Sequence, residues 1–455
     1  MASSKMQSSF DVLEVNHERL TEELIDSMDS RVPLYIWGPP GIGKSVVCNE
    51  VAKNAAKKKG KFYIDWNRAP RAIKHALRDG ELGSELLQLM IKPEPPKSKT
   101  TKPGEKPAKV EHSHNPADDI PSALVSGLMV ASNERMAKDF IAKKKSATVA
   151  DCFIFADYRL SQRDPSDING LPSINSRDYV EWRPTLLFSV LSMPEADGML
   201  FFDEIPQAMP VVQNAAYQLI QDRCCGEISF SDKIVVIAAG NRLTDGGNQF
   251  QIPPALANRF THVELMAPTI EKWADWGIDH NVDSRIIAFL RFKPSYLMDS
   301  MDDVRKKRAM AWCSPRSWEK ASDKIKGFSG AGEKSFDRIY GKVAMACGKA
   351  RATEFRGFIK TTVSLNIKDI LAHPEKAKSF EIGIKWALIS AVSEYYREDK
   401  KFLDDILGLC RHLSADFSVS MLRMMRRYDR TQFATRLAKC KNKEVVLDYM
   451  KYFED

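Results

Sequence analysis

One short stretch of the chain has the residue types and spacing of a phosphate-binding loop. Residues 38–45 read Gly-Pro-Pro-Gly-Ile-Gly-Lys-Ser and directly follow the apolar run Pro33–Trp37. A glycine-rich turn between a strand and a helix directs several backbone N–H groups at one point, where a polyphosphate fits. Lys44 is expected to reach the β- and γ-phosphates, and the Ser45 hydroxyl to hold Mg²⁺. The expected cradle comprises Gly38, Pro39, Pro40, Gly41, Ile42, Gly43, Lys44, Ser45 and Val46.

Two carboxylates end a second apolar run. Gly198–Phe202 precedes Asp203 and Glu204, as expected of a buried parallel strand that delivers acids to the carboxyl edge of its sheet. Asp203 is expected to complete the Mg²⁺ shell, usually through water, and Glu204 to orient or polarise an attacking water. The alternatives are a glycine-rich turn that binds nothing and a solvated acidic pair. The order of strand, loop, helix and acidic strand end disfavours both.

A third apolar run, Ile234–Ala239, ends in Gly240 and Asn241. An Asn that follows a strand is more often a turn former than a catalytic group. Because the carboxyl ends of parallel strands share one edge, this amide is expected near the loop and the acids, where it could contact the γ-phosphate or the water. The three runs together predict an α/β fold with a parallel sheet.

Other helices and strands are needed to bring the ends of these three runs together. Helices are predicted over residues 10–32 and from Val46 to Lys59. A family resemblance carried by these and the following motifs implies a strand soon afterwards, but the matching apolar run is Cys152–Ala156, so an insertion occupies about residues 60–150.

Three parts of this insertion differ in composition. Phe62–Ile91 has some helical periodicity, Lys92–Lys109 is rich in Pro and Lys and is expected to be disordered, and a helix is expected around Pro121–Lys143. A flexible linker is one interpretation of the insertion, and contact with a partner or a nucleic acid is the other.

Together these motifs resemble the MoxR-like branch of the AAA+ ATPases, specifically the dynein-related group. The resemblance covers most of the chain from about residue 30 onward. It implies an AAA+ P-loop NTPase core over residues 1–265, a helical lid over 266–330 and an all-helical C-terminal extension over 331–455. The similar segments are Asp157–Pro172, Asp203–Glu204, Asn214–Arg223, Ala239–Asp245, Pro254–Phe260 and Ser314–Trp318.

The resemblance also implies roles for three side chains. Asn241 takes the sensor 1 role, Arg259 matches an arginine finger that projects into the nucleotide of a neighbouring subunit, and Arg316 matches the sensor 2 arginine of the lid. A planar, always-charged guanidinium suits the charge spread over phosphoryl oxygens. Capping of helix carbonyls is the alternative for Arg259, and stacking on an aromatic ring is the alternative for Arg316. Whether Arg316 acts in its own subunit or across the boundary stays open.

The helical half and one loop carry further expectations. Phe355–Ile359 and Ile384–Val392 supply apolar faces at helical spacing, and Gly327 and Gly330 mark a boundary between lid and extension. Residues 170–184 match the insertion in the second helix of this branch, which tends to face the pore of a ring. Tyr179 and Trp182 are therefore candidates for gripping a client, with packing against the subunit's own sheet as the equal alternative.

The resemblance implies ATP and Mg²⁺ as cofactors and a hexameric ring of identical chains. It also implies a companion with a von Willebrand factor A type domain. The companion is expected to be another chain, although the spacing D-x-S-x-S does occur at Asp416–Ser420, and no N-K-x-D guanine signature follows the sheet edge. The leading hypothesis is a ring-forming ATPase that remodels or activates a protein client. A nucleic-acid-associated motor and an ATP-gated assembly switch are the alternatives.

Composition and charge bear on the partners of the protein, its location and the state of its cysteines. The chain has 455 residues, of which 44% are hydrophobic, and a net charge of +8, which permits nucleic-acid contact without requiring it. No apolar run is long enough to span a membrane and Met1–Phe10 has no signal core, so a cytoplasmic location is expected. The eight cysteines lack C-x-x-C spacing and are expected to be reduced and mostly buried, and His112 and His114 to be solvated.

Overall fold

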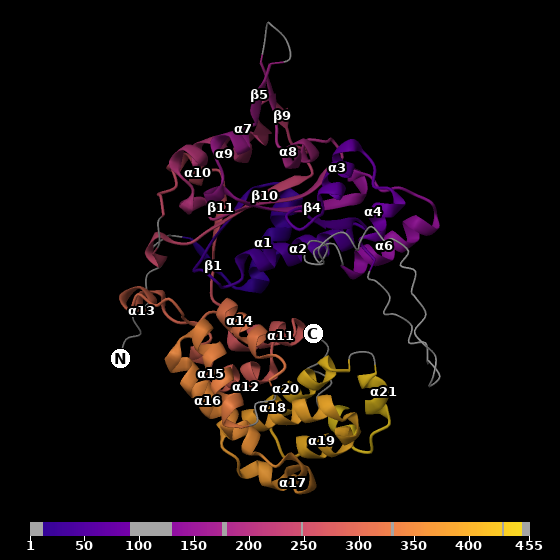
Figure 1. Ribbon diagram of the computed structural model, residues 1–455, viewed down its shortest axis with the longest axis vertical. Helices are drawn as coiled ribbons and strands as arrows, with labels where there is room; N and C mark the ends of the chain where they lie inside the picture. Colours follow the sequence, from indigo (N-terminus) through magenta and orange to yellow (C-terminus); the bar gives the residue numbers. More distant parts are fainter. Residues whose placement is uncertain are drawn as a thin grey trace, which may run out of the picture. The chain divides into compact units, whose positions relative to one another are not determined.

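The computed structural model describes residues 12–91, 130–174, 180–246, 249–328, 332–429 and 432–447. The chain divides into two compact units, Met1–Met266 and Ala267–Asp455 (Figure 1). Each unit has a hydrophobic core of its own.

A seven-stranded parallel sheet forms the centre of the first unit, which confirms the expected α/β fold. Its strand order is β1-β11-β2-β10-β7-β4-β3. The central strands are apolar almost throughout because helices cover both faces of the sheet. The strands are β1 (Leu13–Val15), β2 (Leu34–Trp37), β3 (Phe62–Asp65), β4 (Cys152–Arg159), β7 (Asp197–Asp203), β10 (Ile234–Gly240) and β11 (Thr261–Leu265).

Two layers of helices enclose this sheet. Helices α1 (His17–Ser30) and α2 (Lys44–Lys58) cover one face, and α3 (Arg71–Asp79), α8 (Leu186–Leu191) and α9 (Pro210–Asp222) cover the other (Figure 1). Alternate strand residues such as Ile154 and Leu200 point to the second layer, where they join Phe188 and Leu219 in one apolar cluster.

Two strands of this sheet correct the sequence-based predictions. Leu13–Val15 is strand β1 instead of the start of a helix over residues 10–32, and Phe62–Asp65 is strand β3 instead of part of a helical segment. Each run is short and gains its stability from a partner strand far along the chain, β11 or β4, so local periodicity did not reveal it. β3 lies soon after helix α2, where the resemblance implied a strand, whereas the run that was matched to that strand, Cys152–Ala156, lies in β4.

The insertion is described only in part. Helices α3, α4 (Ser84–Gln88) and α6 (Ala131–Ala142) lie within it, so the helix expected around Pro121–Lys143 is present over 131–142. Residues 92–129, including the tract Lys92–Lys109, His112 and His114, lie outside the described residues.

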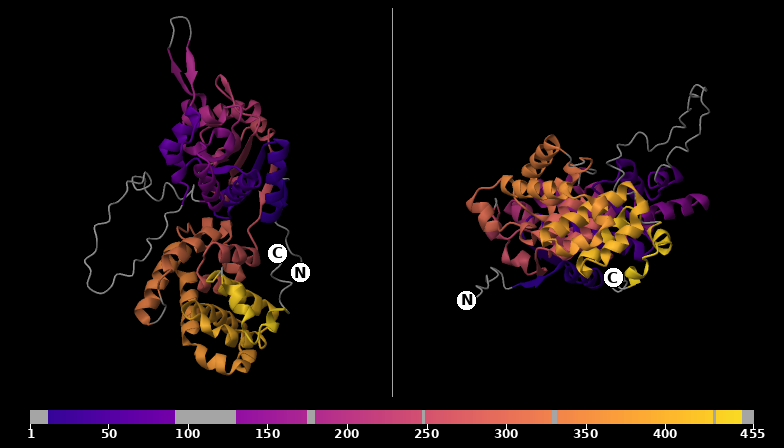
Figure 2. Two further views of the ribbon diagram at one scale, coloured as in Figure 1. Left: turned by 90° about the vertical axis from the view of Figure 1, so that its right-hand side faces the viewer. Right: turned by 90° about the horizontal axis from the view of Figure 1, so that it is seen from below.

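A β-hairpin projects from the body of the first unit (Figures 1 and 2). Its strands are β5 (Leu171–Ser173) and β6 (Glu181–Arg183), which pair antiparallel. α7 (Pro165–Asn169) precedes it. The unit also contains the short antiparallel pair β8 (Cys224–Cys225) and β9 (Ile228–Ser229), and helix α10 (Pro254–Ala257).

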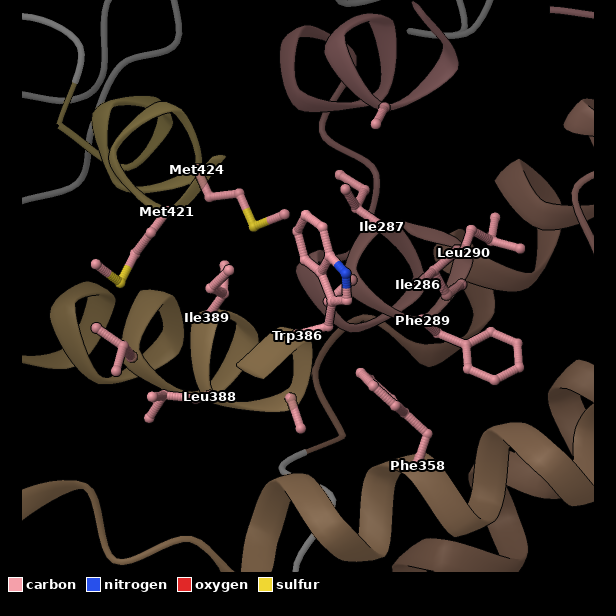
Figure 3. Close-up of a cluster of buried hydrophobic side chains, with 14 of the residues drawn as sticks. Ile286, Ile287, Phe289, Leu290, Phe358, Trp386, Leu388, Ile389, Met421 and Met424 are labelled. Atoms are coloured by element: carbon pink, nitrogen blue, oxygen red, sulfur yellow. The ribbon is translucent and has the colours of Figure 1, made fainter. Parts of the chain in front are cut away.

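The second unit is helical and has a single apolar core. In Figure 3, Trp386 from α18 lies between Ile287 of α12 and Met424 of α20. This cluster runs from Ile270 to Val445, so the expected lid and extension share one core, and Gly327 occupies a left-handed turn (φ 87°) within the unit. The helices are α11 (Ile270–Asp279), α12 (Ser284–Phe292), α13 (Met301–Lys306), α14 (Pro315–Ile325), α15 (Glu333–Cys347), α16 (Lys349–Ser364), α17 (Ile367–Ala372), α18 (Ile382–Glu398), α19 (Leu403–Cys410), α20 (Ala415–Arg427), α21 (Phe433–Ala438) and α22 (Glu444–Leu447).

The apolar helical stripes and the cysteines were expected to be buried. Phe355, Phe358 and Trp386 are buried, which confirms that the two apolar helical stripes face the core. All eight cysteines are free, and six of them are buried. Within the described ranges, none of the helices combines the length and the apolar character that crossing a membrane requires.

Candidate functional site

The loop between β2 and α2 has the backbone geometry of an anion cradle. Gly38, Gly41 and Gly43 have φ values of 150°, 84° and 106°, a region that residues with a side chain rarely adopt. Gly43 is the N-cap of the 15-residue helix α2 and supplies no side-chain cap. The N–H groups of the first turn and the positive end of the helix dipole are therefore presented to a ligand.

The Lys44 ammonium is buried within this loop. Its Nζ donates to Gly38 O at 2.7 Å, to Pro39 O at 3.1 Å and to Asn241 Oδ1 at 2.9 Å. The contact with Asn241 joins the loop to the end of β10, although Lys44 and Asn241 are far apart in the sequence. The structure thus brings the glycine-rich loop and the end of the third apolar run together.

Ser45 and Asp203 form a second link across the sheet. Ser45 Oγ donates to Asp203 Oδ2 at 3.1 Å, and the backbone N–H of Glu204 donates to Asp203 Oδ1 at 3.0 Å. Burial raises the pKa of Asp203, while the charge of Lys44 opposes that shift. A hydroxyl and a carboxylate are the hard oxygen donors that Mg²⁺ prefers, so this pair fits the ion. Among the described residues no group of three or more His, Cys, Asp or Glu could hold a metal ion.

Glu204 is held in an unusual conformation at the end of β7. Its φ and ψ of 61° and 35° lie in the left-handed region, which is rare for a residue with a side chain and tends to occur at functional sites. Ser161 Oγ donates to Glu204 Oε2 at 2.9 Å. Sequence reasoning missed Ser161, although a hydroxyl just after β4 falls at the same edge of the sheet as Glu204.

Asp157 and Arg159 extend the polar edge onto β4, and no role was predicted for either. Arg159 pairs in register with Asp203, and its Nη2 lies 3.5 Å from Asp157 Oδ2. Burial, followed by the charge of Asp203, raises the pKa of Asp157 from 3.8 to about 6. In the described part of the chain no group hydrogen-bonds Asp157 Oδ1. The carboxylate of Asp157 therefore costs stability when it is charged.

We expect Asp157→Asn to stabilise the protein at neutral pH. Because the pKa of Asp157 is raised in the folded chain, the folded state holds more protons between about pH 4 and pH 6, and stability falls as the pH rises through that window. The substitution should raise the free energy of unfolding by about 1–2 kcal/mol at neutral pH, with a smaller gain near pH 4. Denaturant unfolding at a series of pH values measures this difference.

Asp139→Asn is the matched control for that experiment. Asp139 is an exposed helical carboxylate that pairs with Lys143 at 2.9 Å, and such surface pairs contribute little to stability. A pH-independent gain in Asp157→Asn, or the same curve in both variants, would contradict the assignment of a destabilising buried charge.

Arg259 lies at the opposite end of the strands from the glycine-rich loop, just before β11 begins. It comes two residues before β11, whose first residue Thr261 pairs with Leu34 at the start of β2, whereas Lys44 follows the end of β2. Its guanidinium carbon lies 3.6 Å from the ring centroid of Tyr217, and it donates to Gln221 Oε1 and Ala255 O. The contact with Ala255 O is the carbonyl capping that was considered as the alternative. At about 3.3 Å per residue, the four residues of β2 place the arginine roughly 13 Å along the strands from its own phosphate loop.

Four further residues were predicted from the sequence to serve the nucleotide or a client. Arg316 is exposed in the first turn of α14 in the second unit, where its charge acts on Glu319. Trp182 lies on β6 and is 43% exposed instead of buried against the main sheet, and Leu171, Ile174 and Val180 of the same hairpin are also exposed. Val46 is exposed in the first turn of α2, and Tyr179 lies outside the described residues.

His17 contacts the loop from helix α1, and no sequence signal marked it. Its Nε2 lies 2.9 Å from Ile42 O, and burial lowers the pKa of its ring. A β-carbon on Gly43 would lie 3.5 Å from the same ring nitrogen. The first helix therefore supports the back of the phosphate loop.

Comparison with known proteins adds no relative. No protein-family model matches the chain, and no curated protein matches its sequence.

Proposed function

We propose that this chain is a Mg²⁺-dependent ATPase of the MoxR-like AAA+ kind. The observation that carries the proposal is the convergence of Lys44, Asp203, Glu204 and Asn241 on one edge of a single parallel sheet, beside a glycine loop that opens a helix. A phosphate-binding loop alone would support nucleotide binding. The carboxylate pair and the amide beside it support hydrolysis.

Each side chain of the cluster has a chemical task in this proposal. Lys44 and the N–H groups of the first turn of α2 bind the terminal phosphates, and Ser45 and Asp203 hold the ion. Bound Mg²⁺ supplies charge neutralisation at the phosphate oxygens. Glu204 orients the attacking water and takes up its proton, and Ser161 fixes the Glu204 carboxylate. Asn241, next to Lys44, contacts the γ-phosphate or the water.

Assembly into a ring is part of the proposal. Arg259 lies about a strand's length from its own loop, and this separation supports a role at the phosphate site of another chain. Its partners in the isolated chain, Tyr217, Gln221 and Ala255 O, lie at the unit's surface or near it. We propose that the arginine exchanges these contacts for a neighbour's nucleotide and that Arg316 acts as the lid arginine.

A protein is the proposed client of this ring. The β5–β6 hairpin presents Leu171, Ile174, Val180 and Trp182 as exposed apolar side chains, a surface that suits an unfolded or partly unfolded polypeptide. A companion with a von Willebrand factor A type domain is proposed as the adaptor. Measuring ATP turnover with an unfolded protein and then with single-stranded nucleic acid distinguishes a protein remodeller from a nucleic-acid motor.

We expect Arg259→Ala to bind ATP but to hydrolyse it at least tenfold more slowly, because the charge that it supplies to the neighbouring site is lost. Wild-type specific activity should rise with protein concentration as rings form. Mixing Arg259→Ala with Lys44→Ala, each with little or no activity alone, should restore activity, since a mixed interface joins an intact loop to an intact arginine. Turnover assays on each chain and on the mixture measure this rescue.

Arg223→Ala is the control, because Arg223 lies at the end of α9 and its guanidinium binds Arg31 O instead of the Arg259 partners. Activity that does not depend on concentration, with no rescue on mixing, would contradict the ring. It would favour a switch in which nucleotide binding controls assembly and turnover is incidental.

A further inference from the structure

Four rings form a column on one face of the sheet, beside the phosphate loop. Residues alternate between faces along a strand, so Tyr35 and Trp37 of β2 share a face with His262 of β11, and Tyr35 pairs directly with His262. The Tyr35 ring centroid lies 4.3 Å from that of Trp37, 5.5 Å from that of His262 and 5.4 Å from that of Phe260. The column therefore runs from the residue before Gly38 to the residue after Arg259.

Two hydrogen bonds connect Trp37, at one end of this column, to helix α10 through His262. Trp37 Nε1 donates to His262 Nδ1 at 3.1 Å, and His262 Nε2 lies 2.8 Å from Ala257 O. An indole N–H is only a donor and a carbonyl oxygen is only an acceptor. Nδ1 of His262 must then accept, and Nε2 must carry the hydrogen that is donated to Ala257. Both bonds exist together only for this neutral tautomer.

The two ends of the connection belong to different nucleotide sites under the proposed function. Trp37 is the last residue of β2 and leads directly into the chain's own phosphate loop. Ala257 ends α10, two residues before Arg259, and Arg259 also donates to Ala255 O of that helix. His262 thereby joins the strand that positions one loop to the helix that positions the arginine.

The aromatic column also touches the end of strand β10, which leads to Asn241. Gly240, which precedes Asn241, packs so closely against the Tyr35 side chain that a β-carbon would lie 2.2 Å from its hydroxyl oxygen. Tyr35 is fully buried, and burial raises its pKa well above the ordinary value, so its side chain stays neutral. A shift of this column would move the ends of both β2 and β10.

We infer that His262 is a positioning residue, which holds the α10–Arg259 segment in register with the chain's own phosphate loop through Trp37 and Ala257. The inference rests on the proposed function, because it assumes that Arg259 acts on a neighbouring chain. It assigns to His262 an effect on the site that receives the arginine, separate from the site in its own chain.

The mixing assay can test this assignment with His262→Phe, which keeps an aromatic ring in the column but removes both hydrogen bonds. In the mixture, the Lys44→Ala chain supplies the arginine and the Arg259→Ala chain supplies the loop. We expect His262→Phe to lower the rescued activity at least fivefold when it is placed in the Lys44→Ala chain. In the Arg259→Ala chain the same change should lower it less than twofold.

His262→Gln serves as the conservative variant in the same assay. Its amide oxygen can accept from Trp37 and its amide N–H can donate to Ala257, so it should recover at least half of the lost activity. A direct ATP-binding measurement and a thermal unfolding curve on His262→Phe show whether the chain still folds and fills its own loop.

The remaining outcomes overturn the inference in distinguishable ways. Equal losses in both placements, or a larger loss in the chain that supplies the loop, would show that His262 supports only the fold or its own loop. Failure of the parental Lys44→Ala and Arg259→Ala mixture to regain activity would overturn the ring proposal, and the inference with it.

Discussion

Lys44→Ala is expected to abolish tight binding of Mg-ATP, with affinity weakened by at least about 100-fold, or roughly 2.7 kcal/mol. The ammonium is the buried cation of the loop, and its contacts with Gly38 O, Pro39 O and Asn241 Oδ1 place it at the point where the loop closes on a ligand. The truncation removes a charge that pairs with phosphate oxygens in a site largely shielded from water, where charge-assisted hydrogen bonds are strongest.

Calorimetric titration with Mg-ATP measures this loss directly. Lys57→Ala is the matched control, because Lys57 is an exposed lysine of the same helix α2 and should leave affinity unchanged. Lys44→Met separates charge from packing, since it fills much of the same volume without the ammonium and should bind as poorly as Lys44→Ala. Affinity close to that of the parent in either Lys44 variant would reject the assignment of the nucleotide site.

Glu204→Gln should keep nucleotide binding but reduce turnover by about 10² to 10⁴-fold. The amide has the size of the carboxylate and can still accept a hydrogen bond from Ser161, but it cannot take up a proton from water. The neighbouring Asp203 and Ser45 remain in place to hold the ion. Assembly in the presence of ATP should be at least as complete as in the parent, because the bound nucleotide is no longer consumed.

Phosphate-release assays and sedimentation with ATP measure the two halves of this result. Glu195→Gln is the control, because Glu195 is an exposed carboxylate just before β7, at the opposite end of that strand from Asp203. Parental hydrolysis by Glu204→Gln would show that another group activates water, and Asp157, beside Asp203, would be the next residue to test.

The parts of the site that could be predicted from sequence are those written in consecutive residues. A loop of fixed spacing, an apolar run ending in Asp203 and Glu204, and a run ending in Asn241 each mark a strand and its polar end. Parallel strands present their carboxyl ends at one edge, so the shared edge follows from the fold class. The contacts of Lys44 with Asn241 and of Ser45 with Asp203 are consistent with that expectation.

The short edge strands were beyond such reasoning. β1 and β3 contain three and four residues, too few for a period to appear, and each is a strand only because β11 or β4 lies beside it. The contact of Ser161 with Glu204 and the burial of Asp157 also depend on how β4 aligns with β7.

The sequence by itself determined the glycine-rich loop, the acidic strand end and the parallel α/β sheet, because each depends on neighbours along the chain. Only the tertiary structure decided at which end of the strands the other side chains lie. It placed Arg259 at the edge opposite its own loop and joined Trp37 to Ala257 through His262, since strand register brings residues 225 positions apart into hydrogen-bonding distance. Such contacts arise from the packing of distant segments, which leaves no periodic trace in the order of the residues.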